Sequence, residues 1–269
     1  MPPPNVRTIA DLRQALAALG AQDQTFAAAG SRLTFGAKEL DAALDGGLPV
    51  AALHEVYAAK EGDGPAASAF ALALMLRAAP QKNIVWVRQD MAARELGELY
   101  PPGLAEFGAD PRSIVSVQVK DAMAALRAGN EALRCPALGA VAIELWGPAK
   151  AVDLTATRRL VRAVEKTGTM ALLIRLAAEP MPSAALSRWS VRTSSSAALT
   201  ADAPGISRFD VDLLRHRAGF PPMSFCMEWD HDRSSFRTAF QAPALSRSMA
   251  AMAPDRSAAP DQTPLRRAG

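Results

Sequence analysis

The sequence predicts an α/β fold built on a mostly parallel sheet flanked by helices, with antiparallel strands added at its C-terminal end. Between residues 53 and 176, short apolar runs alternate with longer amphipathic segments, the order of strand–helix units that form a parallel sheet. The runs at 138–146 and 170–176 are almost continuously apolar, as expected of strands buried on both faces. After residue 178, three segments alternate apolar and polar residues with only loops between them, which is typical of antiparallel edge strands.

The expected elements follow one another closely along the chain. Residues 8–19 carry apolar side chains at helical spacing behind a capping Thr8, and residues 36–45 form a second helix that a Gly-Gly pair and a proline stop. Strands are then expected at 53–57, 83–87, 113–119, 138–146 and 170–176, and helices at 65–78, 92–107, 121–134 and 153–166. The helix at 92–107 should break near Pro101 and Pro102, and Asp121 should cap the helix that it opens. The antiparallel strands are expected within 188–196, 208–217 and 223–232.

Composition divides the chain into three parts. Residues 1–30 comprise the N-terminal helix and a small, polar linker, and residues 31–240 form the main domain. Residues 241–269 mix prolines with alanine, serine and arginine, so they cannot bury enough apolar surface to offset the entropy of ordering them. We expect this last part to be a disordered tail.

Charge and cysteine content narrow the function classes. The formal charge of the 269 residues is +3, and four arginines against two aspartates put most of that excess in residues 241–269, so the charge signal for DNA binding is weak. No run approaches the roughly 18 apolar residues of a membrane span, and the first residues do not resemble a signal peptide. A cytoplasmic protein with no membrane partner is expected. Cys135 and Cys226 are far apart and without a His or Cys cluster, which predicts neither a disulfide framework nor a metal site.

Several segments resemble known proteins. The run FGAKELDAALDGGLPVAALHEVY, Phe35 to Tyr57, resembles the entry to the RecA recombinase core, where a helix of the form LDxxLGGGLPxGxxxEIYG leads into the phosphate loop. The later runs RWSVRTSSS, VDLLRHRAGFPP and FCMEWD resemble the ImuA family of bacterial RecA-like proteins, which are encoded with a mutagenic DNA-polymerase cassette. On this resemblance, which covers about residues 32–232, the chain is identified as a member of that family and its fold is expected to be RecA-like.

The loop that should bind a nucleotide lacks the residues for that task. In the form GxxxxGK[ST], backbone N–H groups wrap the phosphates, the lysine reaches the outer phosphates and the hydroxyl holds magnesium. Here Ala58 replaces the first glycine, the loop is one residue longer, and Gly64-Pro65-Ala66 stands in place of GK[ST]. Pro65 also removes a backbone N–H at the start of the helix. The degenerate loop thus comprises Ala58, Lys60, Gly62, Gly64, Pro65 and Ala66, with Lys60 on the wrong side and expected to be a solvated charge.

Two further positions also differ from those of an active nucleoside triphosphatase. By the resemblance, Gln89 stands where a recombinase strand delivers the glutamate that activates water, and an amide cannot serve as a base. Asp90 is expected to cap the following helix instead. Glu144 occupies the position of the magnesium-binding carboxylate, but without a phosphate ligand its expected role is to hydrogen-bond the degenerate loop. We therefore expect no catalytic residue, no nucleotide cofactor and no metal.

Surface recognition remains as the expected use of such a scaffold. Arg215, Arg217 and Phe220, in the run RHRAGFPP, are candidates for contact with an acidic partner or a phosphate backbone. His54, His216 and His231 have no partners at ligand spacing, and Ser194–Ser196 lack a nucleophile elbow, so core or surface roles are expected for them.

The resemblance implies a function in damage-induced mutagenesis. In the ImuA family the protein works with ImuB, an inactive polymerase-like adaptor, with an error-prone DNA polymerase and with RecA, and contact with DNA is indirect if it occurs. Two other hypotheses stay open from the sequence. One is an active DNA-dependent ATPase that tolerates an unusual loop, and the other is a cell-division inhibitor like SulA, a shorter RecA-like relative.

Overall fold

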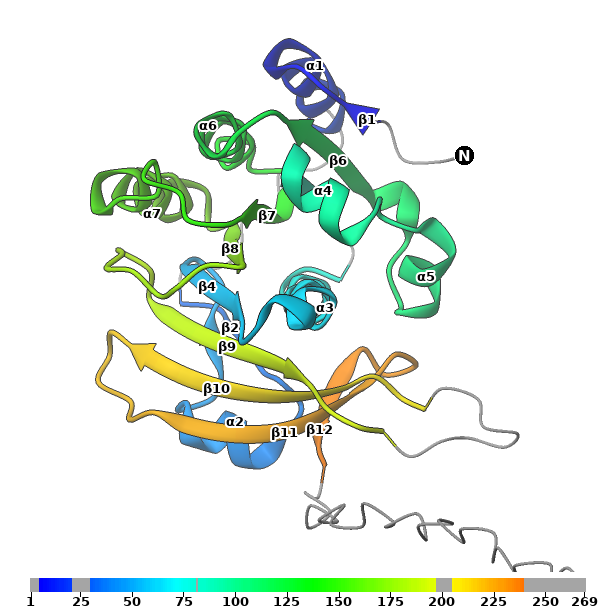
Figure 1. Ribbon diagram of the computed structural model, residues 1–269, viewed down its shortest axis with the longest axis vertical. Coiled ribbons are helices and arrows are strands. Elements are labelled where there is room, and N and C mark those ends of the chain that lie inside the picture. Colours follow the sequence, from blue (N-terminus) through cyan, green and yellow to red (C-terminus); the bar gives the residue numbers. More distant parts are fainter. Residues whose placement is uncertain (1–4, 21–29, 81, 197–204, 240–269) are drawn as a thin grey trace, which may run out of the picture. The chain divides into compact units, whose positions relative to one another are not determined.

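A computed structural model of the chain describes residues 5–20, 30–80, 82–196 and 205–239 (Figure 1). The compact unit ends at Ala239. The predicted tail at 241–269 and most of the predicted linker before residue 30 lie outside the described residues. Within the described parts of the chain, no helix is long and apolar enough to cross a membrane.

The elements confirm the predicted alternation of strands and helices. The helices are α1 (Ile9–Gly20), α2 (Lys38–Ala43), α3 (Gly64–Ala78), α4 (Asp90–Leu96), α5 (Pro101–Glu106), α6 (Ala122–Ala132) and α7 (Leu154–Thr167). The strands are β1 (Asn5–Val6), β2 (Arg32–Leu33), β3 (Leu48–Pro49), β4 (Leu53–Ala58), β5 (Asn83–Gln89), β6 (Ile114–Val119), β7 (Leu138–Trp146), β8 (Met170–Leu176), β9 (Ser187–Thr193), β10 (Arg208–His216), β11 (Met223–Asp230) and β12 (Ser235–Thr238). Two short 3-10 turns, η1 (Glu61–Asp63) and η2 (Pro111–Ser113), precede α3 and β6.

Ten strands form one sheet in the order β1-β6-β5-β7-β8-β4-β9-β10-β11-β12. Neighbouring strands are parallel from β1 to β9 and antiparallel from β9 to β12. The predicted class, a mostly parallel sheet with antiparallel strands at the C-terminal end, is therefore confirmed. The chain leaving β5 turns outward to β6, whereas the chain leaving β7 turns the other way to β8, so the carboxyl ends of β5 and β7 form the switch point where α/β folds bind ligands.

Strand β9 differs from the prediction, because it pairs in parallel with β4 and only its other edge is antiparallel, to β10. The cause is the connection before it. Residues 177–186, which we call the strap, run from the carboxyl end of β8 back to the start of β9, where the Leu186 amide donates to the Leu53 carbonyl. Local alternation of apolar and polar residues could not reveal this return path.

Two apolar cores cover the two faces of the sheet. One core joins the sheet to α3, whose side chains are buried on nearly every side, together with α2 and parts of α4 and α5. The other joins the opposite face to α1, α6 and α7. Helix α6 approaches β7 closely at Gly129, where a Cβ atom would lie only 2.2 Å from the Ile143 Cδ1. A larger residue at that position would push α6 away from the sheet.

Helix ends follow the expected caps with one exception. Thr8 accepts a hydrogen bond from the Asp11 amide, and Asp121 accepts one from the Ala124 amide. The predicted break in the helix at 92–107 begins at Gly97, which has a φ of 77°, and α5 starts at Pro101. Asp90 does not cap α4, because the capping position is occupied by Gln89 and Asp90 is the first helical residue.

Candidate functional site

The loop from β4 to α3 joins a buried strand to a helix through the short turn η1, and its amides hydrogen-bond within the protein. Ala58 ends β4 and is buried, Lys60 and Gly62 are exposed, and α3 begins at Gly64. Pro65 is exposed in the first turn of α3, and Ala66 is buried below it. The residues singled out from sequence therefore lie together at the carboxyl edge of the sheet.

The amides of this loop donate within the protein. The Ala59 amide donates to the Val191 carbonyl at 3.0 Å, and the Asp63 amide donates to the Lys60 carbonyl at 3.0 Å. The Gly64 amide donates to the Glu61 carbonyl, closing the turn of η1. A phosphate loop works by turning such N–H groups toward the ligand. Here three of them are already satisfied.

Asp63 places a carboxylate at the start of α3. It is 6% exposed, and its Oδ1 accepts a hydrogen bond of 3.0 Å from the Thr193 amide on β9. The amino end of a helix carries partial positive charge that attracts anions, and the Asp63 side chain, which makes no capping hydrogen bond to α3, places a buried negative charge beside that end. Sequence reasoning did not select Asp63, although two acidic residues inside a phosphate-loop position, Glu61 and Asp63, were a readable signal.

Apolar side chains cover the same helix start. A Cβ atom built on Gly64 would lie 2.9 Å from the Leu96 Cδ2 and 3.7 Å from the Leu176 Cδ2. Leu176 is fully buried, and Leu96 packs against the core that holds α3. The helix start therefore faces hydrocarbon contributed by the ends of α4 and β8.

At the switch point, the polar side chains of Gln89 and Glu144 form hydrogen bonds within the fold. The Gln89 Oε1 accepts a hydrogen bond of 3.1 Å from the Trp146 amide, which ties the end of β5 to the end of β7. Glu144 is fully buried, and it accepts a hydrogen bond of 2.5 Å from the Ser68 hydroxyl of α3. Its other oxygen forms an ion pair with the Nε of Arg88, which is 3% exposed. Both oxygens of Glu144 are thus engaged within the fold.

Arg88 is the residue that sequence reasoning missed at this point. It precedes Gln89 on β5, and its Nη1 also donates to the Gly97 carbonyl at 2.8 Å. Glu144 hydrogen-bonds the body of α3 through Ser68, one turn beyond the degenerate loop, rather than the loop itself. The guanidinium is the buried counter-ion of the Glu144 carboxylate.

Comparison with known proteins identifies the family of the chain. No family model matches the chain. The chain is 32% identical over 205 residues to Protein ImuA of Caulobacter vibrioides strain NA1000 / CB15N, an alignment that covers 70% of this chain and 80% of the relative. Protein ImuA of strain ATCC 19089 / CIP 103742 / CB 15 matches with the same values. The chain belongs to the ImuA family.

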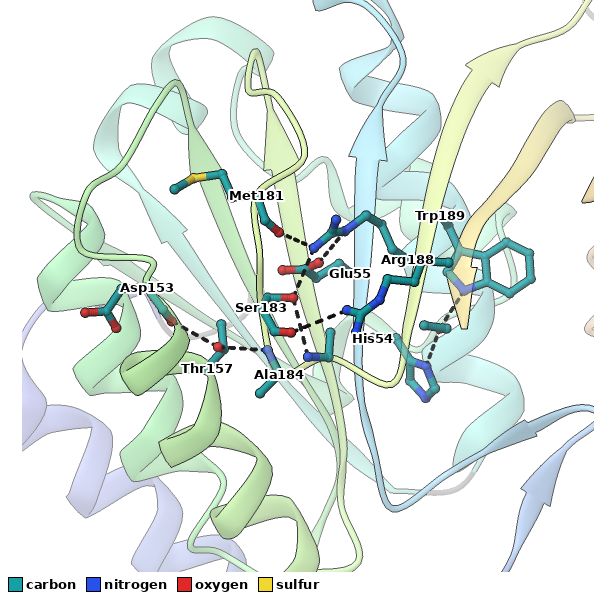
Figure 2. Close-up of polar contacts among 12 residues, drawn as sticks. His54, Glu55, Asp153, Thr157, Met181, Ser183, Ala184, Arg188 and Trp189 are labelled. Carbon is teal, nitrogen blue, oxygen red and sulfur yellow. Dashed lines mark hydrogen bonds and ion pairs between the residues drawn. The ribbon is translucent and has the colours of Figure 1, made fainter. Parts of the chain in front are cut away.

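In this ImuA family member, polar contacts hold the strap on the sheet (Figure 2). Arg188 of β9 forms an ion pair with buried Glu55 of β4 at 2.8 Å, and its Nη2 donates to the Met181 carbonyl and to the Ser183 hydroxyl. From the other side, the Ala184 amide donates to the Thr157 hydroxyl of α7 at 3.1 Å. These contacts fasten the strap to β9 and to α7.

The three candidate contact residues of the RHRAGFPP run meet the strap or the core beside it. The Arg215 Nη1 donates to the Ser183 carbonyl at 3.4 Å, and the Arg217 Nη1 donates to the Ala184 carbonyl at 3.2 Å. Both arginines are exposed. Phe220 is half-buried, with its ring edge-to-face against His216 at a centroid separation of 4.7 Å. The two arginines bond to the strap while leaving charge on the surface.

A fully buried arginine near the end of β8 was not anticipated. Arg175 of β8, inside a run interpreted as apolar, stacks over the Tyr57 ring with its guanidinium carbon 5.8 Å from the ring centroid. None of its three guanidinium nitrogens has a hydrogen-bond partner among the described residues. The cation–π contact with the Tyr57 ring is the interaction that offsets the burial of this charge.

His54 is a core residue of this ImuA chain. Its Nε2 lies 2.9 Å from the Pro49 carbonyl, which can only accept, so Nε2 carries the proton. Its Nδ1 lies 2.7 Å from the Ser187 hydroxyl, which also accepts a hydrogen bond from the Trp189 indole. Burial lowers the pKa of His54 to about 4. The ring is therefore neutral at pH 7, which suits a structural role.

Proposed function

We propose that this protein is a non-catalytic accessory of damage-induced mutagenesis and translesion synthesis, acting through protein contacts with ImuB, RecA and an error-prone DNA polymerase. Membership of the ImuA family, whose genes accompany a mutagenic polymerase cassette, supports the biological role. We place the protein in the cytoplasm as part of the same proposal. The chemistry of the degenerate loop supports the absence of catalysis.

The start of α3, where Asp63 and Leu96 lie, carries this proposal. A nucleoside triphosphate gains most of its binding energy from cations and N–H groups around its phosphates. Here the Asp63 carboxylate would repel those phosphates, and Leu96 would offer hydrocarbon in place of hydrogen bonds. Magnesium would have to displace Arg88 from Glu144, which leaves a buried arginine without its counter-ion. Each of these three features opposes nucleotide binding, which must precede hydrolysis.

Calorimetric titration of the full-length chain with ATP and magnesium tests the absence of nucleotide chemistry. We expect no heat of binding and no phosphate release above background, with or without DNA. Glu144→Gln is the companion variant, because it keeps the hydrogen-bonding shape while removing the charge. ATP hydrolysis by the natural protein that disappears in Glu144→Gln would favour the DNA-dependent ATPase and refute the proposal.

A pull-down from DNA-damaged cells tests the biological role. Recovery of ImuB and RecA with the tagged protein is the expected result. Recovery of neither would remove the accessory role even if the protein proved inactive toward ATP. Filamentation of cells that overproduce the protein would point instead to a cell-division inhibitor.

A further inference from the structure

A basic groove separates α6 from α7, which pack side by side on one face of the sheet (Figure 1). It encloses about 400 Å³ and is lined by Asn130 and Arg134 from the α6 side and by Arg159, Arg162 and Lys166 from α7. The α7 residues follow at intervals of three and four, which places them on one side of that helix. Asn130 lies on α6, and Arg134 follows just beyond the end of that helix.

The positive charge in this groove is largely unpaired. Arg134 forms an ion pair of 3.6 Å with Glu131, which also binds Arg13. Arg159, Arg162 and Lys166 are exposed and make no hydrogen bond or ion pair with another described residue. No residue that lines the groove is acidic.

The helix dipoles account for only part of this arrangement. Cations are favoured in the last turn of a helix, where Lys166 lies, and just beyond its end, where Arg134 lies. Arg159 and Arg162 lie in the middle of α7, where the dipole offers no such stabilisation. Their mutual repulsion is a cost that a bound anion would remove.

We propose that this groove binds the phosphate backbone of duplex DNA without reading its sequence. Arginine predominates among the cations, and its planar fork matches phosphate oxygens. From Arg159 to Lys166 the helix rises about 10 Å, close to three nucleotide steps of about 3.4 Å along one strand.

The lining argues against other polyanions. It contains no aromatic side chain on which a single strand could stack its bases. Ala163 is its only apolar residue, whereas protein interfaces centre on large apolar or aromatic anchors. The groove shares no residue with the degenerate loop or the RHRAGFPP run, so the inference is independent of the non-catalytic role.

Fluorescence anisotropy with a labelled 24-base-pair duplex tests the groove. The variant is Arg159→Gln with Arg162→Gln in the full-length chain, and the matched control is Lys38→Gln with Arg158→Gln, which removes two exposed cations outside the lining. At 50 mM salt we expect the groove variant to bind about tenfold or more weakly, with the control close to the natural protein. The slope of log affinity against log salt should become shallower by about two in the groove variant.

Three outcomes would overturn the inference. Equal losses in the groove variant and the control would show only a general charge effect, to which the tail arginines contribute equally in all proteins. Tighter binding of a single-stranded oligonucleotide than of the duplex would exclude a duplex site. Equal, groove-dependent binding of a poly-glutamate peptide would assign the groove to an acidic protein. Unchanged melting temperatures verify that both double variants fold.

Discussion

The buried ion pair between Arg88 and Glu144 gives the sharpest test of how this site is built. Glu144→Ala would leave the Arg88 guanidinium, which is 3% exposed, without its counter-ion and the Ser68 hydroxyl without its acceptor. Removing one partner of a buried pair typically costs about 3 to 5 kcal/mol of unfolding free energy. The hydrogen bond from Arg88 to the Gly97 carbonyl remains and limits the loss to that range.

Replacing both partners should cost far less. Arg88→Met with Glu144→Leu removes both charges and fills the space with hydrocarbon, so the unfolding free energy should stay within about 1 kcal/mol of the natural value. The exposed pair of Glu228 and Arg237, at 2.9 Å, supplies the control. Glu228→Ala should cost no more than about 1 kcal/mol, because water screens that pair.

Urea unfolding at pH 7, followed by tryptophan fluorescence, measures these differences, because Trp86, Trp189 and Trp229 are buried and report on the core. A loss below about 1 kcal/mol in Glu144→Ala would refute the view that this carboxylate compensates Arg88. A double variant as unstable as the single one would refute the claim that charge, rather than packing, sets the cost. In the accessory role, the double variant should still capture ImuB and RecA.

The remaining predictions concern three other polar positions. The depressed pKa of His54 means that the folded state resists protonation of this ring. The unfolding free energy should therefore be complete above pH 6.5 and fall by about 3 kcal/mol as the pH drops toward 4. An imidazole NMR titration with a midpoint above pH 6 would contradict this. Arg175→Met should leave the unfolding free energy unchanged or raise it by about 1 to 3 kcal/mol in urea unfolding, and a clear fall would show that the contact with Tyr57 outweighs the cost of burying the charge. Arg215→Ala with Arg217→Ala removes two hydrogen bonds to the strap, so thermal unfolding should show a loss near 1 kcal/mol, while mutagenesis in damaged cells is lost; a large drop in melting temperature would make the effect structural.

Much of the fold could be predicted because its rules are local. Apolar runs such as 138–146 and 170–176 predict buried parallel strands, and Asp121 predicts a helix start, since spacing and capping act over a few residues. The loop at Gly64-Pro65-Ala66 was also readable, because a missing lysine is a fact of sequence. The same local rules could not place β9 beside β4, since that pairing depends on a strap that crosses the sheet.

The sequence by itself determined the alternation of strands and helices, the resemblance to the ImuA family and the loss of the phosphate-loop residues. Only the tertiary structure decided what replaced them. Arg88 meets Glu144 across 56 residues of chain, and Asp63 meets the Thr193 amide across 130. The basic groove likewise needs α6 and α7 side by side. Charge pairing and burial depend on distance in space, which local sequence patterns do not encode.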